Sequence, residues 1–204
     1  MTPPYELETT RLRLRQWQAT DKAPFAKLNA DKRVMEYFPC PLSTAQSNAM
    51  VDRLQGAIAQ RGWGFWAVAM KQPDKQPDKQ PPHNTFIGLV GLSIPRTRLP
   101  FSHCGKDRGK DCVEVGWRLD YPYWGKGYAT EAAKASLAFG FETLALEEIV
   151  SFTALVNRRS QAVMERLGMQ RDPHTFNHPS VEKGSPLEEH CLYRLTQQDW
   201  LNQK

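Results

Sequence analysis

The chain has 204 residues, of which 40% are apolar, 24% charged and 10% aromatic, and this composition excludes a disordered or collagen-like chain. The length predicts one domain over residues 1–204, large enough to bury a core without disulfide or metal support. The longest apolar stretch, residues 63–70, is far shorter than the roughly 18 residues that a membrane span needs, and the first residues lack a signal-peptide pattern. We therefore expect a soluble, cytoplasmic protein that does not bind a membrane.

The formal net charge of +5 results from 27 Lys and Arg residues against 22 Asp and Glu residues. Acidic and basic residues are interspersed, and no basic run is long enough for a nucleic-acid patch, so a small anionic ligand is the better candidate partner. The four cysteines form no C-x-x-C pair, which argues against a disulfide framework or zinc knuckle. His174 and His178 are four residues apart, but Pro179 follows at once and helical periodicity is missing. We therefore expect no metal site.

The predicted elements begin with a strand and two helices. Residues 11–15 alternate polar and apolar side chains, as in a half-buried strand. Thr20 or Asp21 is expected to cap a short helix. A longer helix begins at residues 43–46, where Ser and Gln form a capping box, and ends at Gly62.

Two strands, residues 66–70 and 86–93, follow and are joined by a polar segment. This segment, residues 71–82, repeats the tetrad Lys-Gln-Pro-Asp and has no apolar side chain to bury, so it predicts a mobile loop of a hairpin. A second polar insertion, residues 104–111, precedes a strand at residues 113–119. A tolerated insertion explains the repeat better than a binding arm does.

The second half of the chain starts with a glycine-containing turn and a helix whose apolar residues recur every four positions. The residues on that side of the helix are Ala129, Ala133, Leu137, Phe141 and Leu144. A strand at 149–155, a helix at 160–167 that stops at Gly168, a strand at 191–195 and a turn capped by Thr196 complete the pattern. The order β-α-α-β-β-β-α-β-α-β is that of a mixed α/β chain with an antiparallel start and a crossover centre.

The most informative segment is the turn at residues 124–129, which reads Trp-Gly-Lys-Gly-Tyr-Ala between a strand and a helix. Gly125 and Gly127 allow a sharp turn and a close approach of a ligand, while the amides from Lys126 to Ala129 and the helix dipole would face an anion such as a pyrophosphate. The chain lacks both the triphosphatase loop and the dinucleotide-binding glycine pattern. A tight turn without a ligand is the alternative for a lone Gly-x-Gly.

Three segments together resemble the motifs of the GNAT N-acetyltransferases. They are Val-Glu-Val-Gly-Trp-Arg-Leu at 113–119, Tyr-Trp-Gly-Lys-Gly-Tyr-Ala-Thr-Glu-Ala at 123–132, and the pair Asn-Arg-Arg-Ser at 157–160 with Met-Glu-Arg-Leu-Gly-Met at 164–169. The branch most similar is that of the ribosomal-protein N-terminal (alanine/serine) acetyltransferases, and the resemblance covers nearly the whole chain. It implies one GNAT domain over residues 1–204, an α/β fold of the α+β type with a mixed, mostly antiparallel central sheet, splayed strands and flanking helices.

The resemblance implies that acetyl-CoA is the co-substrate and that its acetyl group passes directly to a primary amine, either a peptide or protein N-terminus or a small amine. It implies no metal, and a monomer or homodimer. The implied cofactor-binding residues are Val115, Gly116, Trp117, Trp124, Gly125, Lys126, Gly127, Tyr128, Ala129 and Asn157. The alternative function is a non-catalytic GNAT-fold module that binds an acyl-CoA as a sensor or interaction partner. For Asn157, the alternative is a residue that only forms a turn and does not bind the cofactor.

An acceptor amine is largely protonated at neutral pH, because its reference pKa is about 8 for an α-amine and about 10.4 for lysine. A carboxylate near the thioester, acting directly or through water, would remove that proton. Glu114 is the candidate base, since it precedes the segment 115–117 and shares a strand face with Gly116. The backbone amides of that segment would polarise the thioester carbonyl. An ordinary solvent-facing glutamate is the alternative.

Two positions depart from the family pattern. Trp124 stands where the family has Gln or Arg, so one donor to the phosphates is missing. Met164 stands where many members have a tyrosine that protonates the departing thiolate. Ser160 is therefore the candidate acid or orienting group, with helix capping as the alternative. Cys112 is disfavoured as a nucleophile, because direct transfer needs no covalent intermediate.

Overall fold

The computed structural model describes residues 4–71, 85–97, 99–101 and 112–203. The insertion predicted at 104–111 lies outside these residues, as does all of the repeat predicted at 71–82 except Lys71. The chain divides into two compact units, which are described separately. The first unit comprises Met1–Glu36, Cys40–Gly91 and Trp117–Ala135, and the second comprises Tyr37–Pro39, Leu92–Gly116 and Ser136–Lys204.

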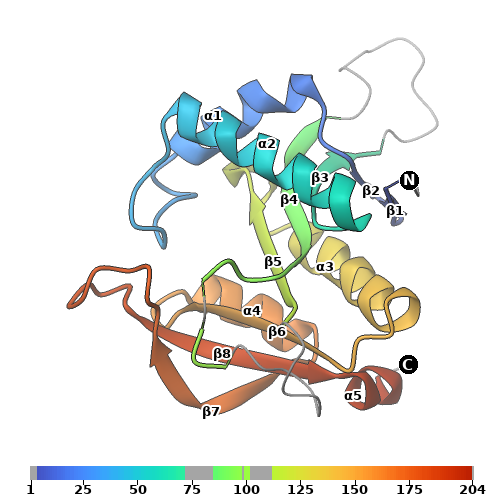
Figure 1. The fold of residues 1–204 in the computed structure, drawn as a ribbon, viewed down its shortest axis with the longest axis vertical. Helices are drawn as coiled ribbons and strands as arrows, with labels where there is room; N and C mark the ends of the chain where they lie inside the picture. Colours follow the sequence, from blue (N-terminus) through green and yellow to red (C-terminus); the bar gives the residue numbers. More distant parts are fainter. Residues whose placement is uncertain (1–3, 72–84, 98, 102–111, 204) are drawn as a thin grey trace. The chain divides into compact units, whose positions relative to one another are not determined.

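The strands form one sheet in the order β1-β2-β3-β4-β5-β6-β8-β7 (Figure 1). Their bounds are β1 (Leu7–Glu8), β2 (Leu12–Arg15), β3 (Phe65–Met70), β4 (Phe86–Ser93), β5 (Glu114–Leu119), β6 (Glu148–Ala154), β7 (Gln170–Asn177) and β8 (Glu189–Thr196). Strands β1 to β4 pair antiparallel in chain order, and β8 is antiparallel to both β6 and β7. Strand β5 is parallel to β6. The predicted mixed, mostly antiparallel sheet is confirmed.

Five α-helices accompany the sheet within the described ranges. Their bounds are α1 (Lys22–Ala30), α2 (Thr44–Arg61), α3 (Tyr128–Ala138), α4 (Arg158–Arg166) and α5 (Gln197–Asn202). A π-helical turn, Phe139–Thr143, continues α3, and short 3-10 helices occupy Ala19–Asp21 and Tyr121–Tyr123. In the part of the chain that the structure describes, every helix is too short or too polar to cross a lipid bilayer.

The helix ends follow the capping residues in most cases. The predicted capping box of α2 is present, because the Gln46 amide donates to Ser43 Oγ (3.2 Å) and the Ser43 amide donates to Gln46 Oε1 (2.8 Å). Gly62 ends that helix at a left-handed φ of 83°, and the Asp199 amide donates to Thr196 Oγ1 at the start of α5. The start predicted for α4 at residue 160 is wrong, since Asn157 is the cap and the helix begins at 158.

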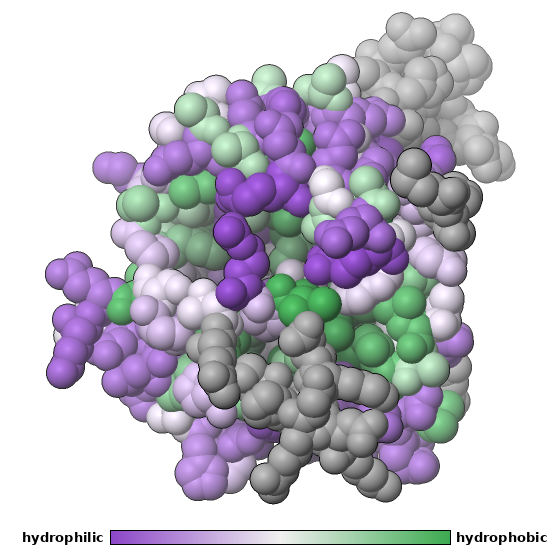
Figure 2. Space-filling view, in the orientation of Figure 1, coloured by the Kyte–Doolittle hydropathy of each residue, from purple (hydrophilic) through white to green (hydrophobic). Residues whose placement is uncertain are grey.

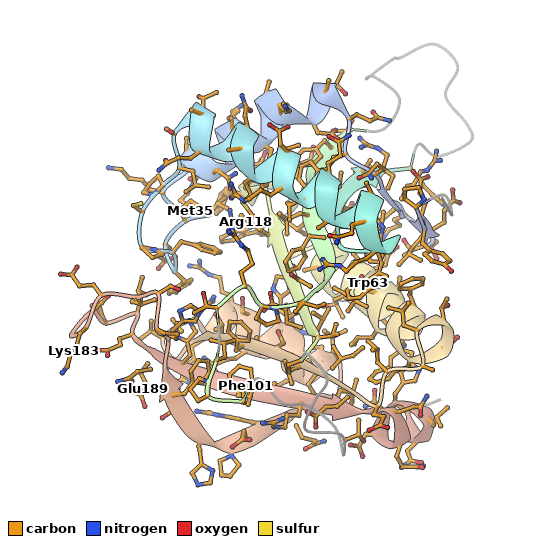
Figure 3. All side chains as sticks on the ribbon, in the orientation of Figure 1. Met35, Trp63, Phe101, Arg118, Lys183 and Glu189 are labelled. Carbon is orange, nitrogen blue, oxygen red and sulfur yellow. The ribbon has the colours of Figure 1, made fainter. Side chains whose placement is uncertain are left out.

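In the first unit, polar contacts are buried beneath α1 and α2. Arg118, on β5 and labelled in Figure 3, donates from Nη1 to Asn29 Oδ1 (2.6 Å), and Asn29 Nδ2 donates to Ser47 Oγ (2.9 Å). Burial lowers the pKa of Arg118 to about 10. Helix α2 buries only Ser47, Val51 and Ile58. Figure 2 shows hydrophilic and hydrophobic residues interspersed on the molecular face that it draws. This network therefore links β5 to α1 and α2.

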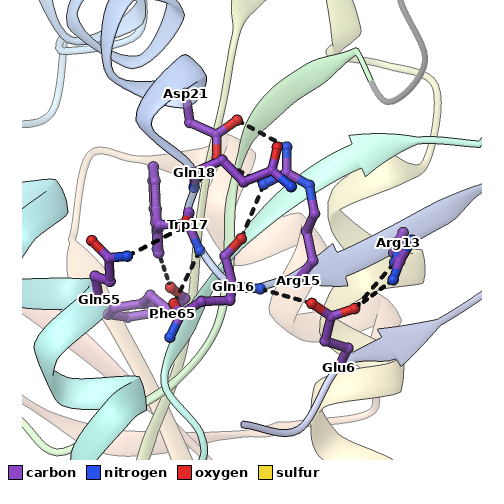
Figure 4. A network of polar contacts seen from close by, with 9 residues as sticks. All are labelled: Glu6, Arg13, Arg15, Gln16, Trp17, Gln18, Asp21, Gln55 and Phe65. Atoms are coloured by element: carbon purple, nitrogen blue, oxygen red, sulfur yellow. Dashed lines mark hydrogen bonds and ion pairs between the residues drawn. The ribbon is translucent and has the colours of Figure 1, made fainter. Parts of the chain in front are cut away.

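A second buried polar contact joins β2 to the start of α1 (Figure 4). Arg15 and Asp21 form a two-point pair, with Nη1 2.7 Å from Oδ2 and Nη2 2.8 Å from Oδ1, and their side chains are only 3% and 2% exposed. Asp21 Oδ2 also accepts a hydrogen bond from the Gln18 amide (2.8 Å). The Asp21 side chain therefore binds Arg15 and the preceding turn and does not cap α1, contrary to the sequence prediction.

In the second unit, an apolar cluster lies on strands β6 and β8. Cys112, Val150 and Leu192 are buried at its centre, with Phe152 and Phe176 packed against them. Cys112 is disulfide-bonded, which the cysteine spacing did not predict, and this excludes it as a free thiol. Cys40 and Cys191 are free.

Replacement of Asp21 by Asn should leave the buried Arg15 charge without its partner and lower the free energy of unfolding by about 3–5 kcal/mol. Urea denaturation of wild type and variant measures this loss. Glu6→Gln is the matched control, because Glu6 lies 2.7 Å from Arg13 in an exposed pair, and its loss should cost at most about 1 kcal/mol. Equal losses in the two variants would contradict the importance of the buried pair.

Candidate active site

The turn that follows β5 is anchored by Trp124. Its indole Nε1 donates to the Leu119 carbonyl (2.7 Å), and its backbone amide donates to the Tyr121 carbonyl (3.1 Å). The Tyr121 and Trp124 rings also lie together, with centroids 5.3 Å apart. Because its N–H group already has an acceptor within the turn, Trp124 holds the loop against the end of β5 rather than replacing the missing phosphate donor.

The two predicted glycines adopt the conformation that the turn requires. Gly125 has φ 71° and Gly127 has φ 80°, a region in which other residues are strained. Helix α3 begins directly afterwards at Tyr128, and the Glu131 amide donates to the Gly127 carbonyl (3.0 Å). The amides of the first helical turn have no preceding helical carbonyl, so they are suited to bind an anion.

Two cationic side chains accompany this turn. Lys126 Nζ lies 5.8 Å from the centre of the Tyr123 ring, and the Arg11 guanidinium lies 4.4 Å from that of Tyr128. Arg11 Nη1 also donates to the Lys126 carbonyl (3.0 Å). Sequence analysis missed Arg11, since the residue fits the alternation of a strand and no local pattern connects it to a loop so far along the chain.

Glu114, the candidate base, begins β5 in the second unit. Its side chain is half-buried but densely surrounded by protein, and this burial raises the pKa of the carboxyl group from 4.5 to about 8. Within the described ranges, the carboxyl group has no hydrogen-bond or ion-pair partner that would oppose the effect of burial. Glu114 is therefore mostly protonated at neutral pH, yet its pKa is close to that of an amine.

The pairing of β5 with β6 is short. Glu114 pairs with Val150, and the next link is a side-chain hydrogen bond, in which Ser151 Oγ donates to the Val115 carbonyl (2.9 Å). Val115 is buried, while Gly116 and Trp117 are half-buried. This limited ladder agrees with the splayed strands that the sequence resemblance implies.

At the start of α4, Asn157 and Ser160 contact each other. Asn157 Oδ1 accepts a hydrogen bond from the Ser160 amide (3.2 Å), and Asn157 Nδ2 donates to Thr153 Oγ1 (2.8 Å) and Ser160 Oγ (3.1 Å). Asn157 is thus the helix cap, a role that the sequence had offered as the alternative for Ser160. The Ser160 hydroxyl acts as an acceptor here and keeps its own proton for donation.

The site residues fall into two groups. Those of the first unit are Trp117, Trp124, Gly125, Lys126, Gly127, Tyr128 and Ala129, and those of the second are Glu114, Val115, Gly116, Asn157 and Ser160. Within the first unit the structure joins residues 124–129 into one turn at a helix N-terminus, and within the second it joins Asn157 to Ser160. Among the described residues, no group of three or more His, Cys, Asp or Glu side chains is placed to hold a metal ion.

The fold is that of a mixed α/β protein in which a turn with two left-handed glycines leads into the N-terminus of α3. Residues 11–170 match the model of the acetyltransferase (GNAT) domain. The chain is 31% identical over 204 residues to the FsC-acetyl coenzyme A-N(2)-transacetylase of Aspergillus fumigatus, with 96% of this chain and 77% of that protein covered. It is 26% identical over 195 residues to the uncharacterized N-acetyltransferase YnaD of Bacillus subtilis, with 95% and 98% covered.

A solved structure shares the fold. It is that of a ribosomal L7/L12 α-N-protein acetyltransferase in complex with coenzyme A, with a TM-score of 0.68, 14% identity, and 96% of this chain and 99% of that chain covered. The chain belongs to the GNAT acetyltransferase family, so the resemblance inferred from the sequence is confirmed. This family uses acetyl-CoA as co-substrate, and the chain is accordingly an acetyl-CoA-dependent acetyltransferase.

The raised pKa of Glu114 predicts a pH-dependent effect on stability. Because the pKa is about 8 in the folded protein and 4.5 for the ordinary group, the folded state retains a proton that the unfolded chain releases between these values. This contribution to stability is complete below about pH 4.5 and is lost as the pH rises through about 8. Glu114→Gln should therefore unfold at a temperature several degrees above wild type at pH 8, with the difference vanishing near pH 4.5.

Differential scanning calorimetry at several pH values measures this difference. Glu182→Gln is the control, because Glu182 is exposed and its replacement should shift the midpoint equally little at every pH. A Glu114→Gln midpoint that differs from wild type by a constant amount across this range would contradict the raised pKa.

Proposed function

We propose that this protein acetylates a primary amine by direct attack of the amine on acetyl-CoA. The observation that carries the proposal is the half-buried Glu114 carboxyl group, whose pKa burial raises to about 8. A base with this pKa can take a proton from an ammonium group of similar pKa at little cost, which a carboxylate of ordinary pKa cannot do.

Glu114 accepts the proton of the attacking amine, directly or through one water molecule. The backbone amides of residues 115–117 stabilise the negative charge that develops on the thioester oxygen. The Ser160 hydroxyl donates a hydrogen bond to the departing thiolate, which takes its proton from water, and the 3.1 Å bond from Asn157 Nδ2 orients that hydroxyl group. The three side chains with these roles, Glu114, Asn157 and Ser160, all belong to the second unit.

The turn at residues 124–129 holds the pyrophosphate of the co-substrate. The left-handed φ angles of Gly125 and Gly127 keep side chains off the loop surface, and the first-turn amides of α3 supply donors. Lys126 adds a positive charge next to these amides. Asn157 caps α4 in this structure. We therefore propose that its main role is to orient Ser160 and that contact with the pantetheine arm is secondary.

The acceptor class follows from amine chemistry. The names of two relatives specify a nitrogen acceptor, N(2) in the FsC transacetylase and an α-N-protein position in the ribosomal L7/L12 enzyme. A base with a pKa of about 8 suits an α-amine, with its reference value of about 8, better than a lysine amine at about 10.4. We therefore place a peptide or protein N-terminus, or a small α-amine, first among the candidates.

Calorimetric titration of the protein with acetyl-CoA at near-physiological salt is the first test. One-site binding at micromolar strength, followed by coenzyme A release when a library of N-terminal peptides and small amines is added, is the expected result. Binding without transfer to any amine would favour a non-catalytic acyl-CoA-binding module. The absence of binding would overturn the proposal.

The proposed base predicts a specific loss of turnover. Glu114→Gln should lower kcat at neutral pH by about tenfold or more while the Kd for acetyl-CoA stays within about twofold, because general base catalysis contributes to the transition state and not to co-substrate binding. In wild type, kcat/KM should rise with pH, with a midpoint near pH 8 and a plateau above it, and the variant should lack this rise. Unchanged turnover in the variant would remove Glu114 from the mechanism.

The proposed pyrophosphate site predicts a specific loss of binding. Gly127→Asp should abolish binding of acetyl-CoA, since a side chain at this left-handed φ strains the turn and its Cβ would lie 3.4 Å from Arg11 Nη2, so that the turn and its amides are displaced. Gly184→Asp is the matched control, because Gly184 has nearly the same φ of 84° and no heavy atom within 4 Å of an added Cβ, so it carries similar backbone strain away from the loop. Retained binding in Gly127→Asp, measured by calorimetry, would refute the assignment of the loop.

A further inference from the structure

A carboxylate one turn into α3 receives hydrogen bonds from the residues that precede β2. Glu131 Oε1 accepts from Thr9 Oγ1 (2.6 Å) and from the Arg11 amide (2.9 Å). Glu131 Oε2 accepts from Arg11 Nε (2.6 Å) and lies 2.6 Å from Arg11 Nη2. Both carboxylate oxygens therefore have two donors each, and all of these groups belong to the first unit.

The Arg11 guanidinium also contacts the glycine turn. Nη1 donates to the Lys126 carbonyl (3.0 Å), and Nη2 would lie 3.4 Å from a Cβ atom placed on Gly127. The guanidinium covers the Tyr128 ring at 4.4 Å. The Arg11 side chain thus contacts Lys126 and Tyr128 and lies beside Gly127, while Glu131 fixes the guanidinium.

The contact between Arg11 and the Lys126 carbonyl also fixes the direction of the Gly127 amide, because the two groups belong to one planar peptide bond. In a planar trans peptide, the carbonyl of one residue and the N–H of the next point in opposite directions. The described residues contain no cis peptide bond, so the peptide between Lys126 and Gly127 is trans. Because Arg11 holds the Lys126 carbonyl, the Gly127 N–H points away from Arg11.

The charges of the pair are also matched to an anionic ligand. Burial acts to raise the pKa of Glu131, but the hydrogen bonds from Thr9 and Arg11 outweigh it and keep this pKa below its ordinary value. An ionised carboxylate close to the first turn of α3 would repel a pyrophosphate if it were alone. The Arg11 guanidinium neutralises it and leaves Lys126 as the net positive charge of the loop.

We propose that Arg11 is the positioning residue of the pyrophosphate-binding turn: fixed by Glu131, it holds the Lys126 carbonyl so that the Gly127 amide faces the diphosphate of the co-substrate. This inference rests on the proposed function, in which that turn binds acetyl-CoA. It adds a residue from the N-terminal segment to a site otherwise made of residues 124–129.

A comparison of two acetyl donors distinguishes a positioning role of Arg11 from a general effect of its replacement on protein stability. Acetyl-CoA carries the pyrophosphate, whereas S-acetylpantetheine shares the thioester and the pantetheine arm and lacks it. Arg11→Gln should raise the KM for acetyl-CoA by about tenfold or more with kcat nearly retained, because a hydrogen bond to a charged group contributes about 1.5–3 kcal/mol. With S-acetylpantetheine, kcat/KM should change by less than about twofold.

Arg11→Lys tests the same role if Arg11→Gln folds poorly. A lysine can keep the ion pair with Glu131, but its single nitrogen cannot also hold the Lys126 carbonyl as the guanidinium does. It should therefore unfold close to the wild-type temperature and still lose several-fold in kcat/KM for acetyl-CoA alone. Arg13→Gln is the matched control, since Arg13 forms a similarly exposed pair with Glu6, and it should leave both donors unaffected.

The outcomes distinguish the two proposals. If wild type fails to bind or use acetyl-CoA, the proposed function is wrong. If wild type uses acetyl-CoA and the Arg11 variants use it equally well, or lose activity with both donors to the same extent, Arg11 does not position the turn. A loss confined to acetyl-CoA in both Arg11 variants supports the inference.

Discussion

The chain has only residues 120–127 in which to pass from the end of β5 to the start of α3, and the architecture of the site depends on how this passage is fixed. Trp124 ties the turn back to Leu119, and the left-handed φ values at Gly125 and Gly127 let the backbone reverse before the helix begins. Arg11 then fixes the one peptide plane that two glycines would otherwise leave free to rotate. A ligand site made of backbone amides needs this rigidity, because an amide cannot be redirected by a side-chain rotamer.

Two glutamates show how surroundings decide what a carboxyl group does. Glu131 receives four donors, so its charge is favoured despite burial and its role is to hold other groups. Glu114 is half-buried without such donors among the described residues, so burial alone determines its pKa, which rises to about 8. The first arrangement stabilises the structure, whereas the second lowers stability as the pH rises from about 4.5 through about 8, and its raised pKa suits the base that we propose.

Local patterns predicted the parts of the fold that local interactions determine. The capping box at Ser43, the helix end at Gly62 and the two glycines of the turn each depend on neighbours within a few residues, and all occur where the sequence placed them. Strand β1, with two residues, and strand β7, with mostly exposed polar residues, carry no apolar alternation and were missed. The Arg11–Glu131 pair joins residues far apart in the chain, so no local pattern encodes it. The cap of α4 is local, since Asn157 accepts from the Ser160 amide three residues later, but Asn157 and Ser160 are both capping residue types and the sequence alone did not decide between them.

Met164 stands where many family members have a tyrosine, but helix α4 carries another hydroxyl group, that of Ser160, which we propose acts on the departing thiolate. Met164 is only 1% exposed, and a phenol at that depth would need a partner of its own. Ser160 lies four residues earlier, hence one turn away on the same face of α4, and it is half-buried rather than enclosed. Because Asn157 takes over the capping of α4, the Ser160 hydroxyl does not serve the helix end. The Ser160 hydroxyl is therefore not used for helix capping, as its proposed role toward the departing thiolate requires.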